Sequence, residues 1–315
     1  MTYAQYGTIQ AADFNALAGG NPTTTSGTLN AVWATGGTTA GYGQTALANV
    51  AVGDTVAASQ WATLVGNTAS AASHQGTAIT SVSVPVTGGT ITYLSAIPTN
   101  LTTIYNSRLN ASSQGSTTSN TITTSTTWSS LATFTHTATF ANGDAARYFF
   151  NSGGQLAITC SHPGSTGIDL LFNNLCSNVG TVVMSSPSSG SITVSAVSYN
   201  GITKIGGNNA STISTNSGYF AMTTSNANVF TQLASTGPSG YLSTFIRIIA
   251  KSNGTQGVNG DTGNVITLFT LFDEVPNGLT VATGTAVTLT VRPPETTYLA
   301  NTWGAITLAG SVAVS

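Results

Sequence analysis

Apolar residues recur along the chain with two different periods, and the change of period divides the sequence. In the first third they lie three or four residues apart, as on one face of a helix. From about residue 118 they alternate with threonine and serine, as in a strand with one buried face. We therefore predict a helical region over residues 1–112 and an antiparallel β domain, with room for two subdomains, over residues 113–315.

Two segments of the N-terminal region share one pattern: TIQAADFNALAGG over residues 8–20 and TVAASQWATLVGN over residues 55–67. In each copy an aromatic residue and a leucine three residues apart predict a small helix that packs by that face. The glycine that follows suits the left-handed position after a helix. The aligned pairs are Phe14 with Trp61, Leu17 with Leu64, and Gly19 with Gly66.

A third helix is predicted near Pro98, because proline suits the first helical turn. Ile97, Leu101, Ile104 and Arg108 follow with heptad spacing over a short length. Such a helix either packs on its own domain or forms a short threefold coiled coil that joins copies of the chain. The candidate attachment and oligomerisation residues of the three helices are Phe14, Leu17, Trp61, Leu64, Ile97, Leu101 and Ile104.

The later part of the chain holds many short segments with a period of two. In FTHTATF, over residues 134–140, phenylalanine, histidine and alanine alternate with threonine. Similar segments, such as GSITVSAVSY, NVITLFTLF and AITLAGSVAV, follow and are separated by Gly, Asn, Pro and Ser. This pattern indicates an antiparallel β-sandwich or jelly roll. We therefore expect a mainly β fold preceded by a small helical anchoring region.

Charged residues make up only 4% of the chain, against about 25% in an ordinary protein. The net charge is −2, and a net charge near zero promotes association, so assembly into something larger is expected.

In NGDAAR, over residues 142–147, Asn-Gly predicts a hairpin turn, and Asp144 and Arg147 are placed to pair and fix that turn or a subunit contact.

The remaining charges lie beside predicted strands. Because an unpaired charge in an interface is costly, we expect Arg247 or Arg292 to pair with Asp273 or Glu274 between strands or between subunits.

The sequence lacks the residues that several classes of function require. Six basic residues are too few to neutralise a nucleic-acid backbone, and neither a membrane-spanning apolar run nor an export signal is present. Asp273 and Glu274 would point to opposite faces of a strand, and G-x-S-x-G, C-x-x-C and H-E-x-x-H are missing. We expect no enzyme activity, cofactor or metal.

The two cysteines are interpreted separately. Cys160 is predicted to be a buried free thiol, with a Cys160–Cys176 bridge as the alternative.

Long segments also carry a resemblance: AADFNALAGG, GYGQTALANVAVGDTVAASQW, FTHTATFANGDAARYFFNSGGQLAI and FIRIIAKSNGTQGVNGDTGNVITLFTLFDEVPNGLTVATGT. In these the chain resembles virion structural proteins of tailed bacteriophages, most closely tail-fibre-like or appendage proteins of cyanophages and related marine phages. The resemblance covers most of the chain and implies a non-catalytic subunit of the particle, assembled in the host cytoplasm. Tail fibre, neck or collar fibre, baseplate component and head decoration protein all remain open.

The partners that the resemblance implies are copies of the chain, as a homotrimer, and other tail, neck or baseplate proteins. A receptor-binding module for host glycans is the alternative, and it would need exposed loop aromatics, for which Tyr219, Phe220 and Tyr241 are candidates. A depolymerising enzyme would instead need two carboxylates facing each other in a groove.

Overall fold

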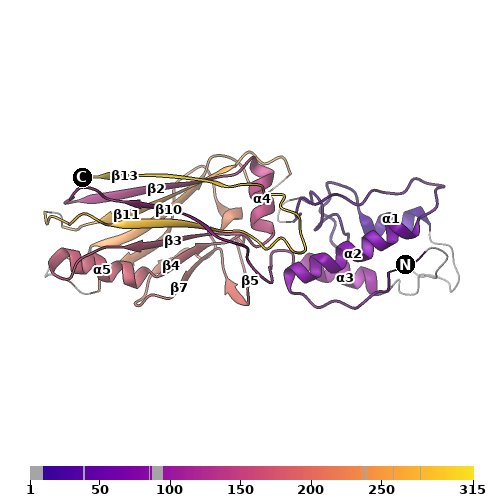
Figure 1. Cartoon of the computed structure of the whole chain (residues 1–315), viewed down its shortest axis with the longest axis horizontal. Coiled ribbons are helices and arrows are strands. Elements are labelled where there is room, and N and C mark those ends of the chain that lie inside the picture. Colours follow the sequence, from indigo (N-terminus) through magenta and orange to yellow (C-terminus); the bar gives the residue numbers. More distant parts are fainter. Residues whose placement is uncertain are drawn as a thin grey trace.

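The computed structural model describes residues 10–37, 40–84, 86, 95–235, 237, 240–257, 259–276 and 278–315. The molecule is elongated, with a β-sandwich forming most of it and a helical part at one end (Figure 1). The predicted mainly β, antiparallel fold with a small N-terminal helical part is confirmed. The C-terminus lies at the end of the sandwich far from α1, α2 and α3 (Figure 1).

The helical module, as we call the described residues between 10 and 108, contains α1 (Ala11–Ala18), α2 (Ala58–Gln75) and α3 (Ala96–Asn106). All three predicted helices are present. The second repeat copy is longer than expected, because Gly66 lies inside α2 and the helix ends instead at Gly76, which has φ of +66°. In the first copy the helix ends at Gly19, as predicted, with φ of +77°.

The apolar faces of these helices form the module's own core. All seven candidate attachment residues are buried there, with an exposed fraction of at most 3%. Phe14 packs on Trp61 with ring centroids 6.0 Å apart. The heptad positions of α3 therefore pack on their own module, which is the first of the two alternatives, although Ile97 also lines a groove at the module surface. An attachment or oligomerisation role for the seven residues stays a prediction. The seven are Phe14, Leu17, Trp61, Leu64, Ile97, Leu101 and Ile104.

Irregular backbone in the module is held by side-chain amides, each of which bonds both the N–H and the C=O of one distant residue. Asn30 does so with Leu47, donating at 2.8 Å and accepting at 2.9 Å. We call this arrangement an amide clamp. It reproduces the two hydrogen bonds of a paired strand with a neutral group. Two other clamps within the module join Asn15 to Val50 and Asn100 to Thr80, and Gln44 of the module forms a fourth with Ala300, which lies outside it.

The sandwich consists of two antiparallel sheets. One has the order β1 (Thr118–Thr123), β12 (Ala286–Arg292), β3 (Gln155–Ser161), β4 (Thr181–Met184) and β7 (Ile202–Ile205). The other has the order β13 (Thr307–Val314), β2 (Leu131–Thr139), β11 (Val265–Asp273), β10 (Phe245–Ser252), β9 (Ala227–Leu233) and β8 (Thr212–Ile213). A separate hairpin pairs β5 (Ile192–Val194) with β6 (Val197–Tyr199).

Alternation along the strands sets which face is buried. In β2 every second residue is buried, including Phe134 and His136, while the threonines between them are half-buried on the outer face. Across the sheet Phe134 packs on Phe272 of β11, with ring centroids 5.5 Å apart. The period of two seen in FTHTATF is thus the alternation between the sandwich core and its surface.

Three further helical segments belong to the sandwich: α4 (Gly143–Asn151), α5 (Gly167–Val179) and the short 3-10 helix η1 (Tyr219–Ala221). The hairpin turn predicted for residues 142–147 is wrong. Asn142 instead caps α4, accepting a hydrogen bond from the backbone N–H of Ala145 at 2.8 Å. Asparagine serves both turns and helix N-caps, and here the following Phe149 and Phe150 supply a helical face for the core.

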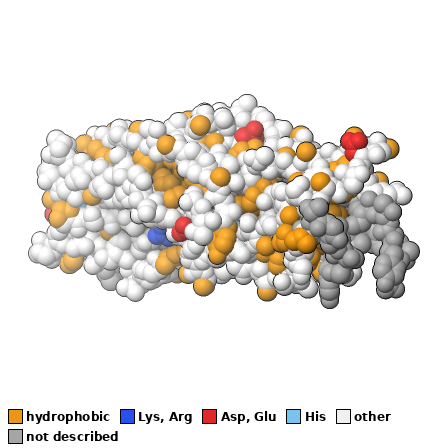
Figure 2. All heavy atoms as spheres, turned by 45° about the vertical axis from the view of Figure 1, so that its right-hand side comes forward, with side chains coloured by type: hydrophobic (Ala, Val, Ile, Leu, Met, Phe, Trp, Pro, Cys, Tyr) orange, Lys and Arg blue, Asp and Glu red, His pale blue; other side chains and the backbone are white. Residues whose placement is uncertain are grey.

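Charged side chains are sparse on the surface, as Figure 2 shows for one face. Among the described residues, no helix has both the length and the apolar character that crossing a membrane requires.

Candidate functional site: the module junction and the adjacent groove

The helical module is fastened to the sandwich by α4. The side chain of Arg147 is fully buried, and its Nη1 donates to the carbonyl oxygens of Thr35 at 2.9 Å and Ala40 at 2.8 Å. One turn further, the Asn151 amide donates to the carbonyl oxygens of Ala40 and Gly41, both at 2.8 Å. Two side chains of the sandwich thus bind the backbone of one loop of the module.

The predicted ion pair between Asp144 and Arg147 is confirmed at 3.1 Å. It lies within α4, where residues three apart share one face, and not in a hairpin turn. Asp144 also accepts a hydrogen bond from the backbone N–H of Gly260, at 3.1 Å. The pair therefore stabilises the module junction and the loop between β10 and β11 together.

Behind the junction, buried uncharged hydrogen bonds hold the module itself together, and His74 continues them to the sandwich. The Tyr42 hydroxyl donates to the carbonyl oxygen of Arg108 at 2.8 Å and accepts from the Gln75 amide at 2.8 Å. Burial raises the pKa of Tyr42, so the phenol stays protonated. The Nε2 of His74 lies 3.1 Å from the carbonyl oxygen of Ser152, which can only accept, so this nitrogen carries the hydrogen.

Close approach at the junction depends on a glycine. Gly43 has φ of +70°, and a Cβ at this position would lie 2.5 Å from the ring of Tyr148. A larger residue would therefore push the module away from α4. Together with the buried hydrogen bonds, this contact fixes the module as a rigid extension of the sandwich.

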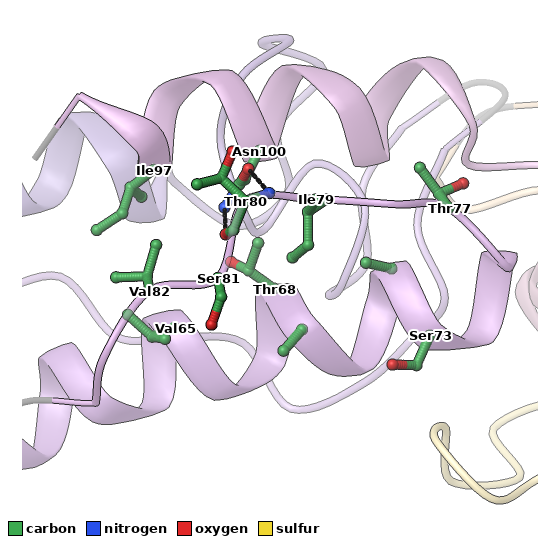
Figure 3. A pocket seen from close by; sticks show the side chains of 12 residues that line it. Val65, Thr68, Ser73, Thr77, Ile79, Thr80, Ser81, Val82, Ile97 and Asn100 are labelled. Atoms are coloured by element: carbon green, nitrogen blue, oxygen red, sulfur yellow. Dashed lines mark hydrogen bonds between the residues drawn. The ribbon is translucent and has the colours of Figure 1, made fainter. Parts of the chain in front are cut away.

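Beside the junction, the module has an uncharged, partly apolar groove between α2, α3 and the extended segment 77–82 (Figure 3). Its volume is about 270 Å³. Val65, Ile79, Val82 and Ile97 point toward it (Figure 3), and the clamp from Asn100 to Thr80 fixes one wall. Ala69 and Ser73 are exposed at its rim. The described residues that line it are apolar or uncharged polar, with no acid or base among them, so the groove suits an uncharged occupant with apolar groups.

The charges of the strands are not paired as predicted. In the described part of the chain, no ion pair joins Arg247 or Arg292 to Asp273 or Glu274. Arg247 lies over the ring of Phe245 at 4.3 Å, diagonally opposite Asp273 on the neighbouring strand. Burial raises the pKa of Asp273, and the charge of Arg247 opposes this shift. A role for these groups between subunits stays a prediction.

Glu274 has a different role from the one predicted. It is fully buried, and its carboxylate accepts hydrogen bonds from the backbone N–H groups of Gly278 at 3.0 Å and Leu279 at 2.8 Å. It therefore closes the turn after β11, and a carboxylate bonded to two N–H donors needs no cation nearby.

A string of polar side chains that sequence reasoning missed involves His162. Its Nδ1 lies 2.8 Å from the Thr285 hydroxyl and its Nε2 lies 3.0 Å from Asp169. The order resembles that of a hydroxyl, a base and an acid in a hydrolase. However, Thr285 is fully buried, so a substrate does not reach its hydroxyl. The string links α5 to the start of β12, and no spacing in the sequence marks it.

The cysteines and the loop aromatics are also placed. Both cysteines are free thiols, as predicted, although Cys160 is half-buried and only Cys176 is buried. Cys160 lies beside Cys176, and burial is the main cause that raises the pKa of Cys176.

Tyr219 is buried and stacked on Phe150, while Phe220 and Tyr241 pack partly against the core. These three aromatics therefore do not form an exposed receptor surface.

Within the ranges described above, no three His, Cys, Asp or Glu side chains gather as metal ligands would. Comparisons with protein-family models, with curated proteins and with solved structures each found no match to this chain. The candidate site is therefore described from the structure alone, as a rigid junction with the groove beside it.

Proposed function

We propose that the chain is a non-enzymatic structural subunit of a tailed bacteriophage particle, namely a tail-fibre, neck-fibre or other appendage protein. The observation that carries the proposal is the junction: buried hydrogen bonds from Arg147, Asn151 and His74 fix a small helical module to the end of a long, nearly uncharged sandwich. This is the construction of a rigid rod with a distinct end for attachment. The resemblance of its long segments to virion proteins supports the same conclusion.

The proposed attachment surface is the groove, to which Ile97 alone of the seven residues first expected contributes. Those seven side chains are buried in the module core, whereas Val84 and Val86, just beyond the groove, are 55% and 72% exposed. An apolar segment of a neighbouring tail, neck or baseplate protein would cover the groove and these valines together. Burying such surface contributes about 25 cal/mol per Å².

The non-enzymatic part of the proposal is supported by the histidines. His74, His136 and His162 are buried, and burial lowers the pKa of each. A general base is most effective when its pKa is near the working pH and its nitrogen is within reach of the substrate. Burial moves the pKa of each of these three side chains down from its usual value and shields the ring from solvent, which disfavours such a role.

The test uses a phage whose gene for this chain is replaced by variants, with quantitative mass spectrometry of the purified particles. Wild-type chain should be recovered in the particles. Ala69→Arg combined with Ser73→Arg places two charges at the groove rim, and we expect a loss of at least about tenfold in incorporation. Thr63→Arg, exposed elsewhere on α2, is the matched control and should be incorporated normally.

Two results would contradict the proposal in different ways. If purified particles contain no wild-type chain, a structural role in the particle is excluded. Normal incorporation of the double variant would leave the role but exclude the groove as its attachment surface.

A further inference from the structure

The two sides of the sandwich differ in how their sheet edges are protected. On one side β8 has only two residues, and Lys204 of β7 closes the gap between the sheets. Its ammonium group donates to the carbonyl oxygens of Asn208 and Asn209 at 3.1 and 3.0 Å and to Gln232 of β9 at 3.2 Å. A short strand and a lysine are the usual means by which proteins keep an edge from pairing with another chain.

The opposite side has an edge with no such protection. β13 is eight residues long, TLAGSVAV, with no charge and no proline. It lies at the end of the six-stranded sheet, and most of its residues are exposed, including Val314 at 36%. An uncharged edge of this length is a template for a further strand.

The register shows which backbone groups are free. The N–H of Ser315 bonds to the carbonyl of Leu131 and the N–H of Phe140 bonds to Asn264, so the odd-numbered residues of β2 bond toward β13. Because antiparallel pairs alternate, the other residues of β13 direct their N–H and C=O groups away from the sheet. These residues are Leu308, Gly310, Val312 and Val314.

We propose that β13 pairs with β13 of a second copy of this chain, antiparallel about a twofold axis at Ser311. The two six-stranded sheets then become one continuous sheet. This register places Leu308 opposite Val314 and Gly310 opposite Val312 of the second copy, so that every free N–H and C=O group of the edge finds a partner.

The side chains favour a second copy over an unrelated strand. On the inner face, Gly310 has no Cβ and Ile122 of β1 fills that space. The larger Val312 of the second copy then lies beside the small residue and against Ile122. On the outer face the exposed residues are small, namely Thr307, Ala309, Ser311 and Ala313. A strand that meets itself in this way is self-complementary.

Twofold pairing also limits assembly at this edge to a closed dimer. Each copy has one such β13 edge, so an isologous contact uses both edges and closes. The net charge of −2 leaves little repulsion between copies. The inference deepens the proposed function, because it names the surface and the symmetry by which copies of the chain join. It rests on the proposed function only for its biological setting.

The test is made on the purified full chain by sedimentation equilibrium. We expect a mass of twice the chain mass of 31.7 kDa. Ser311→Asp places two carboxylates directly opposite each other at the axis and should raise the dimer dissociation constant at least about tenfold. Ser198 is another exposed serine, on β6, and Ser198→Asp is the matched control that should leave the constant unchanged.

A second variant gives a positive signal. Non-hydrogen-bonded residues facing each other across strands have Cβ atoms about 4.5 to 5.5 Å apart, close to disulfide geometry. Ser311→Cys should therefore form a covalent dimer when oxygen oxidises the two thiols, which release two electrons and two protons to it. Ser198→Cys should stay monomeric on a non-reducing gel, as should the wild type with its two native cysteines.

A monomeric or trimeric wild type would overturn the inference, as would a dimer that Ser311→Asp leaves unchanged and Ser311→Cys does not cross-link. Because the measurement needs no particle, failure here leaves the particle role standing. Failure of the incorporation experiment likewise leaves the dimer standing.

Discussion

Arg147 is the residue on which the contact between the two parts of the chain depends. Its guanidinium group is fully buried and bonds two backbone carbonyls and one carboxylate. We expect Arg147→Ala to lower the free energy of unfolding by about 3 to 5 kcal/mol, because buried carbonyls lose their donors and Asp144 loses its cation. Urea unfolding measures this change.

The control for Arg147 is Arg292→Ala, since Arg292 is only half-buried and its change should stay below about 1 kcal/mol. Arg147→Lys should recover only part of the loss, because an ammonium group cannot reproduce the planar set of donors. Equal losses for Arg147→Ala and Arg292→Ala would contradict this account of the junction.

At the scale of an element, the turn after β11 depends on the carboxylate of Glu274. We expect Glu274→Gln to lower the free energy of unfolding by about 1.5 to 3 kcal/mol, because charge-assisted bonds to two N–H groups are replaced by weaker bonds to one amide oxygen. The measurement is again the urea midpoint.

The neighbouring residue provides the control for Glu274. Asp273 is half-exposed on the outer face of the same strand, so Asp273→Asn should change the free energy of unfolding by less than about 0.5 kcal/mol. A larger effect for Asp273→Asn than for Glu274→Gln would show that strand charge, and not the turn, matters here.

Elements were predictable from the sequence where the pattern was local. The alternation in β2, β10, β11 and β12 and the three module helices follow from spacing alone. α5 was not predicted, although Ile168, Leu171, Phe172 and Leu175 carry helical spacing that could have revealed it. α4 was misread because Asn-Gly serves two structures. Elements with one strong period could be found, and those with competing signals could not.

The candidate site was not predictable in the same way. The junction joins residues more than a hundred positions apart, such as Arg147 with Thr35 and Gln44 with Ala300. The helix stripes were correctly read as apolar, but which surface they meet depends on the packing of the whole module. A hydrophobic pattern shows that a face is buried and leaves open what covers it.

For the whole molecule, stability should fall with acidification. Burial lowers the pKa of His136 and His162, and it lowers the pKa of His74 to about 4. The unfolded chain takes up these protons near pH 6.5, whereas the folded chain resists them. The free energy of unfolding should therefore decrease as pH falls below 6.5. His74 contributes a decrease of about 1.4 kcal/mol per pH unit down to about pH 4, and His136 and His162 contribute in the same direction.

Urea midpoints across this pH range measure the decrease. His74→Gln retains a donor for the carbonyl of Ser152 but does not titrate, so the slope should become smaller in this variant. A slope that His74→Gln leaves unchanged would show that His74 is not among the groups responsible.

The amide clamps of the helical module have a consequence for the medium in which it keeps its shape. Side-chain amides neither gain nor lose protons and hold no counter-ions, so brine, fresh water or mild acid leaves each of these bonds as it is. The wall of the groove that Asn100 fixes on Thr80 therefore has the same contour in dilute and in concentrated electrolyte. Whatever binds there meets a surface whose form is independent of salinity.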